Sequence, residues 1–93
     1  MFTTITKSQA KLGMEDEIRR IWNEQVGPKL QAVPGIQSIS SYVNLSTGEA
    51  ISTISWENKE AFDTYLQSGQ RAEILAPFRA VLEAMPDPPE GYE

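Results

Sequence analysis

The sequence predicts a small α+β domain, in which a ferredoxin-like, split βαβ antiparallel sheet carries its helices on one face. Runs rich in β-branched residues alternate along the chain with segments whose apolar residues recur at helical spacing. Two of the strand-like runs are joined by a short turn rich in hairpin residues. The resulting order is strand, helix, strand, strand, helix, helix, which is the order of the split βαβ motif.

Residues 2–7 form the first predicted strand, because apolar residues alternate with threonine there and β-branched residues dominate. A helix follows, because apolar residues recur along one side of it. These residues are Met14, Ile18, Ile21, Trp22, Val26 and Leu30. Pro28 would clash with the carbonyl of Glu24, so a kink or a break is expected there. Pro34 and the glycine after it end the element.

The middle of the chain predicts an antiparallel hairpin. Residues 36–45 and 50–56 form its strands, and the turn at residues 46–49 has the composition of a hairpin loop. Ile54 and Trp56 are expected on one face of the second strand because side chains alternate along a strand.

Two helical segments follow the hairpin. Asn58 is a good N-cap for the first of them. The second covers residues 71–85, and Pro77 is expected in the first turn of a fresh segment because proline is tolerated there. The proline-rich tail cannot be helical, but its last residues are able to add a short strand.

The whole chain, residues 1–93, is expected to be a single domain. Its strands carry apolar residues on both faces, whereas the helices cover only one. A symmetric homodimer with the open sheet faces packed together, a dimeric α/β barrel, would cover the other. A domain of this size buries only about two thirds of its unfolded surface, and without cysteine it cannot use disulfides.

Composition excludes several classes of function. The net charge is −5 and only eight lysines and arginines are present, so the basic surface that nucleic-acid binding needs is not expected. No apolar run approaches the roughly 20 residues that span a bilayer, and a soluble cytoplasmic protein without membrane contact is expected. The absence of histidine removes histidine-based acid–base catalysis, Ser-His-Asp triads and histidine metal sites.

The acidic run Glu15, Asp16 and Glu17 allows two interpretations. It resembles a carboxylate cluster for a metal ion, but acids in the first turn of a helix also complement the helix dipole. Consecutive helical residues do not converge on one ion. The second interpretation is therefore favoured, and no metal site is predicted.

From Pro34 onward the chain resembles the antibiotic-biosynthesis-monooxygenase family of dimeric α+β barrels. The resemblance is strongest over residues 34–78, and Trp56 followed by Ala61 and Phe62 in "W-E-N-K-E-A-F-D-T-Y-L-Q-S" is its most specific part. The family includes cofactor-independent monooxygenases of quinols and aromatic polyketides, and haem-degrading enzymes. The positions of the tryptophan and histidine of haem-degrading members are Tyr65 and Leu75 here, and leucine cannot ligate iron. Quinol-oxidising members often carry histidine at the position of Tyr65.

The resemblance implies a small-molecule cavity between the sheet and the helices. Three residues are candidate catalytic groups: Asn44 and Tyr65 as hydrogen-bonding partners of a carbonyl or phenol, and Arg71 as the group that stabilises a phenolate. Aromatic residues are candidates to bind the substrate as walls of the cavity. These residues are Trp22, Tyr42, Trp56, Phe62 and Phe78. No cofactor is predicted, because an electron-rich phenol or quinol can itself reduce oxygen.

Other interpretations stay open from the sequence alone. The aromatic side chains are also what a packed core requires, Asn44 also suits the turn that follows it, and Arg71 also suits a surface ion pair with Asp63 or Glu73. The protein is then a non-catalytic dimeric binding or stress-related domain. An isomerase or lyase that uses Glu57 or Asp63 as its base is a third interpretation.

Overall fold

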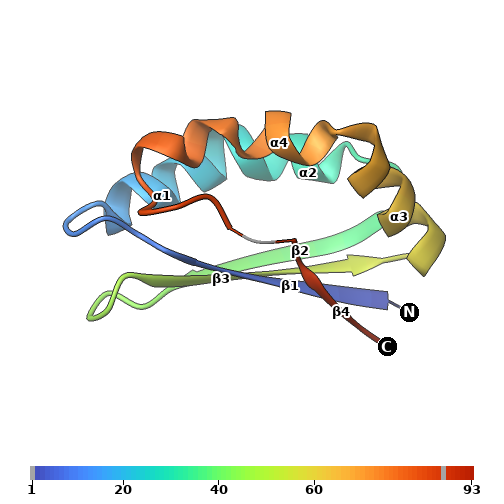
Figure 1. Cartoon of the computed structure of the whole chain (residues 1–93), viewed down its shortest axis with the longest axis horizontal. Helices are drawn as coiled ribbons and strands as arrows, with labels where there is room; N and C mark the ends of the chain where they lie inside the picture. The colour runs from blue at the N-terminus through green and yellow to red at the C-terminus, as the bar shows by residue number, and fades with distance from the viewer. Residues whose placement is uncertain (1, 87) are drawn as a thin grey trace.

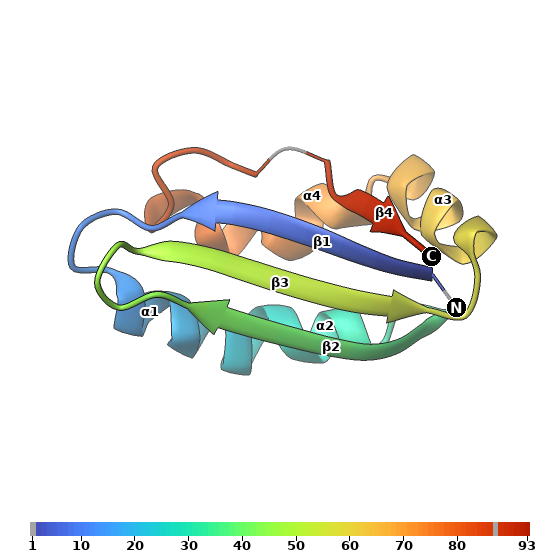
Figure 2. The ribbon, with the colours of Figure 1, turned by 90° about the horizontal axis from the view of Figure 1, so that it is seen from below.

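The computed structural model describes residues 2–86 and 88–93 and has the predicted α+β architecture. Its strands are β1 (Phe2–Gln9), β2 (Ile36–Val43), β3 (Glu49–Trp56) and β4 (Glu90–Tyr92). They form one antiparallel sheet in the order β2-β3-β1-β4, which is the ferredoxin-like order read from its far edge. Figure 1 shows all the helices on one side of this sheet, and Figure 2 shows the uncovered face with the four strands side by side.

The helical layer is built from short consecutive segments. They are α1 (Glu15–Ile21), the π-helical η1 (Trp22–Val26), α2 (Gly27–Gln31), α3 (Lys59–Ser68), α4 (Gln70–Leu75) and the 3₁₀-helical η2 (Ala76–Ala80). None of the helices in the described part of the chain is long and apolar enough to cross a membrane. Asn58 caps α3 as predicted, since its Oδ1 accepts a hydrogen bond from the backbone N–H of Ala61 at 2.9 Å.

The first helix continues through Pro28, so the expected break does not occur there. The turn before the proline opens into the π-helical segment η1, in which the Gly27 N–H donates to the Trp22 carbonyl five residues earlier. The wider turn accommodates a proline that an α-helical interior would reject. Gly27 is required here, because a Cβ atom would lie 2.9 Å from the same carbonyl oxygen.

Strand β2 contains an irregularity near its start that decides which side chains face the helices. Ile36 pairs with Trp56, but the next pair is Ser38 with Ser55, so Gln37 is an extra residue. Alternation therefore reverses after this β-bulge. Ile36 and Ile39 both pack against the core, and Tyr42 projects from the other face.

The register places matching rows of side chains on the two faces of the sheet. The row toward the helices near the end of β3 contains Phe2 and Trp56, and both are buried. The prediction that Ile54 and Trp56 lie on the same face of their strand is confirmed, since Ile54 is also buried. On the open face, Ile51 lies between Lys7 and Tyr42.

Strand β4 confirms that the tail adds a strand to the sheet. Residues 90–92 pair antiparallel with β1 at its outer edge, with Thr4 opposite Gly91. A side chain is excluded at Gly91, because a Cβ atom would lie 2.2 Å from Cζ of Phe2. Strand β4 thus forms the edge of the sheet beside β1 (Figure 2).

Candidate functional site

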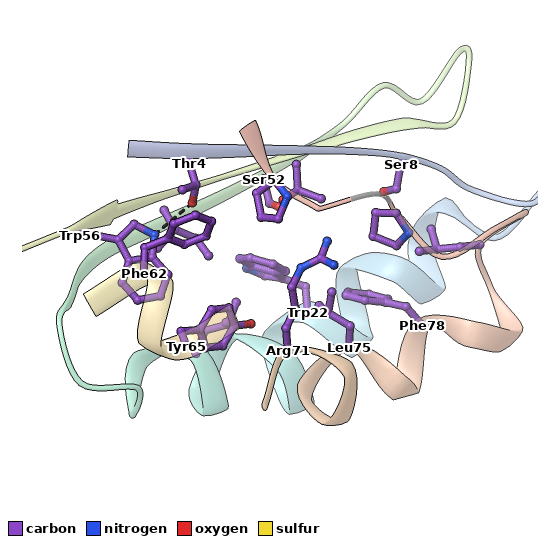
Figure 3. A pocket seen from close by; sticks show the side chains of 16 residues that line it. Thr4, Ser8, Trp22, Ser52, Trp56, Phe62, Tyr65, Arg71, Leu75 and Phe78 are labelled. Atoms are coloured by element: carbon purple, nitrogen blue, oxygen red, sulfur yellow. Dashed lines mark hydrogen bonds between the residues drawn. The ribbon is translucent and has the colours of Figure 1, made fainter. Parts of the chain in front are cut away.

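The described residues enclose a cavity of about 50 Å³ between the sheet and the helices. Most of its wall is hydrocarbon or aromatic, from Trp22 and Leu30 of the first helix to Leu75 of α4 and Phe78 of η2. Pro86 and Pro89 line it from the tail. Figure 3 shows the aromatic and basic side chains extending from the helices toward Thr4, Ser8 and Ser52 on the sheet.

Six of the residues predicted for the site line this one cavity. They are Trp22, Trp56, Phe62, Tyr65, Arg71 and Phe78. They come from the first helix, β3, α3, α4 and η2, so the fold gathers residues that lie far apart in the sequence. Several also belong to the hydrophobic core, so in this protein the cavity wall and the core are largely the same residues.

Two predicted site residues lie elsewhere. The Asn44 side chain belongs to the hairpin turn, where its Oδ1 accepts hydrogen bonds from the backbone N–H groups of Ser46 and Thr47 at 2.9 and 3.2 Å. This is the turn-forming role that the sequence also allowed for Asn44. Tyr42 is 65 % exposed and lines a separate groove beside Arg19 and Asn23 at the β2 edge.

Trp56 lines the cavity from the end of β3. Its side chain is fully buried, and its ring lies 5.5 Å from the Phe62 ring and 5.3 Å from the Tyr65 ring, measured between centroids. The indole N–H donates to the Thr4 hydroxyl at 3.0 Å (Figure 3). Because Thr4 uses this N–H, Trp56 offers a ligand an apolar surface and not a hydrogen-bond donor.

Tyr65 is buried, and burial raises the pKa of its phenol to about 12 although the positive charge of Arg71 acts in the opposite direction. Its hydroxyl end points toward the Arg71 side chain (Figure 3). The neutral phenol can donate its proton in a hydrogen bond, but it cannot serve as a base near pH 7. Among the described residues that line the cavity, Arg71 carries the single formal charge.

The raised pKa of Tyr65 predicts a loss of stability in alkali. Between about pH 10 and pH 12 the unfolded chain has released the phenolic proton while the folded protein still holds it. The free energy of unfolding should therefore fall across this window by about 2 kcal/mol. Urea denaturation at successive pH values, together with the tyrosinate absorbance, measures the effect. Tyr65→Phe should lose this component; an unchanged alkaline slope in that variant would contradict the assignment.

Four hydroxyl side chains of the cavity were missed by the sequence reasoning. Thr4, Thr6 and Ser8 come from β1 and Ser52 from β3. A usable signal was present, because Ser52 shares its parity with Ile54 and Trp56, which were predicted to share one face, and Trp56 was predicted to line the cavity. In the same way, Thr4 and Thr6 share the parity of Phe2.

The structure places the acidic run in the first turn of α1, which supports its interpretation as a helix start. Asp16 pairs with Arg19 at 3.0 Å and the half-buried Glu17 pairs with Arg20. No group of three or more acidic side chains among residues 2–86 and 88–93 is arranged to hold a metal ion. At Leu75, the family position that would need histidine to hold haem, the cavity wall is hydrocarbon.

Comparisons with known proteins agree with this architecture. The crystal structure of an antibiotic biosynthesis monooxygenase is 15% identical, with a TM-score of 0.74 over 100% of this chain and 97% of that one. A protein from Bordetella bronchiseptica is 13% identical, with a TM-score of 0.81 over 99% and 94%. Rv0793 from Mycobacterium tuberculosis is 15% identical, with a TM-score of 0.70 over 99% and 92%.

These identities establish a shared fold and do not by themselves transfer an activity. No curated protein matches the chain. The model of the family described as antibiotic biosynthesis monooxygenase matches residues 1–84, which include every helix and the first three strands. The chain therefore belongs to the antibiotic biosynthesis monooxygenase family.

Proposed function

We propose that this protein is a cofactor-independent oxygenase that acts on a small aromatic phenol or quinol. The observation that carries the proposal is that Arg71 and the neutral Tyr65 hydroxyl line a cavity whose walls are mostly apolar and aromatic. An aromatic ring matches the walls, and an ionised oxygen on that ring matches the guanidinium and the phenolic donor. Family membership supports the same class of chemistry.

In the proposed reaction a quinol and dioxygen become a hydroxyquinone and water. Arg71 favours the ionised quinol, whose proton leaves to solvent, and the electron-rich ring then reduces dioxygen. One oxygen atom forms a new bond to a ring carbon, the O–O bond breaks, and the second atom leaves as water. The substrate supplies all the electrons, so the protein contributes orientation, exclusion of water and stabilisation of the anion.

Arg71→Ala should lower kcat/KM by about a hundredfold, because it removes the charge that stabilises the anion. The melting temperature should change by no more than about 4 °C, since Arg71 is only half-buried. Oxygen uptake with a panel of quinols, measured above the rate of autoxidation, tests this. Arg79→Ala is the matched control, because Arg79 is an exposed arginine of η2. Equal losses of activity in both variants, or a parallel loss of stability and activity in Arg71→Ala, would count against the role.

The same proposal includes a homodimer formed through the open sheet faces, which would make a dimeric barrel. The face without helices carries Ile5, Ile51 and Tyr42 among small hydroxyl side chains. Ile51 lies in a row between Lys7 and Tyr42, so it is the apolar centre of that row. Burial of such a face in a second copy removes apolar surface from water and extends a small core.

Ile51→Glu should convert the dimer to a monomer, because burying a carboxylate at the apolar centre of the interface has a desolvation cost that the neighbouring Lys7 offsets only in part. Sedimentation equilibrium measures the mass directly. Gln67→Glu on the exposed side of α3 is the matched control, since it adds the same charge away from the sheet. A wild-type protein that sediments as a monomer of 10.4 kDa would exclude the dimer.

A non-catalytic ligand-binding domain is the second candidate function. The small cavity volume of about 50 Å³ favours it, and so does the high pKa of Tyr65, which leaves that residue without a basic form near neutral pH. Ligand binding without oxygen uptake would support this candidate.

A further inference from the structure

A row of hydroxyl side chains crosses the inner face of the sheet. Thr6 of β1 lies opposite Ser52 of β3, and Ser52 lies opposite Ser41 of β2. We call Thr6, Ser52 and Ser41 the hydroxyl row. All three are half-buried. Inner strand positions under a helical layer are normally aliphatic, because burial of a hydroxyl is costly unless it is hydrogen-bonded.

The hydroxyl row forms the floor of two adjoining cavities. Thr6 and Ser52 line the main cavity, whereas Ser52 and Ser41 line a second cavity of about 30 Å³. The two cavities share Trp22, Phe78 and Leu82 as apolar wall residues. The interior is therefore polar along one strip of the sheet and, apart from Tyr65 and Arg71, apolar on the side of the helices.

The hydroxyl row and Arg71 offer a ligand two different polar contacts. The row is neutral and can both donate and accept hydrogen bonds. The Arg71 side chain extends toward the sheet from α4, on the opposite side of the cavity (Figure 3). A ring with oxygen atoms on two of its edges satisfies both contacts, and its carbon atoms then lie against Trp22 and Phe78.

The size of the cavity limits the number of rings. One water molecule needs about 10–15 Å³ of cavity volume, so the main cavity of about 50 Å³ has room for only a few waters. Three fused rings exceed this space. A single ring needs the main cavity together with the adjoining second cavity of about 30 Å³. Pro86 and Pro89 of the tail close the wall on the β4 side.

We propose that the hydroxyl row binds one oxygenated edge of a single-ring dihydroxyarene, whose other oxygen faces Tyr65 and Arg71. This inference rests on the proposed function, which orients the ring toward Arg71. It adds the number of rings in the substrate and the residues that determine specificity. Thr6 and Ser52 are the specificity-determining residues of the main cavity.

The test measures binding without oxygen, so that no turnover occurs. Hydroquinone, benzene and anthrone are titrated separately into ¹⁵N-labelled protein, and amide chemical shifts report both the affinity and the location. Hydroquinone should perturb residues around the cavity, and anthrone should not. Thr6→Val, which keeps the β-branched shape, should weaken hydroquinone binding about tenfold and leave benzene binding unchanged.

Thr3→Val is the matched control, because Thr3 lies on the same strand but opposite Ser55 on the outer face. Ser52→Ala provides a second removal of a hydroxyl from the row if Thr6→Val does not fold. Unchanged hydroquinone affinity in the folded row variants, no binding of hydroquinone to the wild type, or anthrone bound in the cavity would each overturn the inference. Hydroquinone binding without oxygen uptake in air would remove the oxygenase and leave the inference standing.

Discussion

Gly35→Ala is expected to lower the free energy of unfolding by about 2–4 kcal/mol. Gly35 has a φ of +91°, where a side chain is strained. Its Cβ atom would also lie 2.4 Å from Cβ of Ala61 at the start of α3, and neither backbone can easily withdraw. The Gly35 carbonyl accepts a hydrogen bond from the Glu57 N–H at 2.7 Å, so movement at this point would disturb the end of β3. Urea denaturation measures the loss.

Two controls separate the clash from the strain at Gly35. Gly69 has a φ of +79°, and a Cβ atom added there would meet nothing within 4 Å, so Gly69→Ala should cost only about 1 kcal/mol. Ala61→Gly removes the opposing Cβ atom and should recover part of the stability of Gly35→Ala. Equal losses at Gly35 and Gly69 would show that the contact with Ala61 relaxes without cost.

Trp56→Ala is expected to destabilise the protein by about 3–5 kcal/mol, since it removes a fully buried indole from the core. Part of the stability that Trp56 contributes comes from a hydrogen bond, which its indole N–H donates to the Thr4 hydroxyl. Thr4→Val should cost about 1–3 kcal/mol in the wild type, where it leaves a buried donor without its acceptor. In a Trp56→Phe background the same change should be nearly neutral.

This double-mutant cycle uses free energies of unfolding from urea titrations of the four proteins. A coupling energy near zero would mean that the hydrogen bond between Trp56 and Thr4 contributes nothing measurable to stability. Thr53→Val on the outer face of the sheet is the control for replacing a strand threonine. It should change stability by less than about 0.5 kcal/mol.

Much of the fold could be predicted because the strand alternation and the helical spacing in the sequence agree with the turn and cap residues between them. The alternation in residues 50–56 placed Ile54 and Trp56 on one face, and the Asn58 cap marked the start of α3. Proline was less informative on its own. Pro77 opens the 3₁₀ segment η2 as predicted, but the sequence around Pro28 did not reveal that a π turn would accommodate it.

The candidate site was predicted unevenly, and the reason lies in the strand register. Helical aromatic residues such as Phe62 and Tyr65 were correctly brought to the cavity, because helical spacing fixes their direction. Tyr42 was not, because the bulge at Gln37 reverses the alternation that begins at Ile36. The hydroxyl row was missed because a single sequence does not show where a core leaves space beside a small polar side chain.

The π turn has a consequence for the phase of the first helix. Met14, Ile18, Trp22, Val26 and Leu30 are spaced four residues apart. In a continuous α-helix each such step exceeds a 3.6-residue turn by about 40°, so the last position would be rotated by about 160° from the first. The extra residue in the π turn winds the chain back, and Val26 and Leu30 lie in the same core as Ile18. Gly27 and Pro28 thus mark the place where a helix that would drift off the sheet is returned to it.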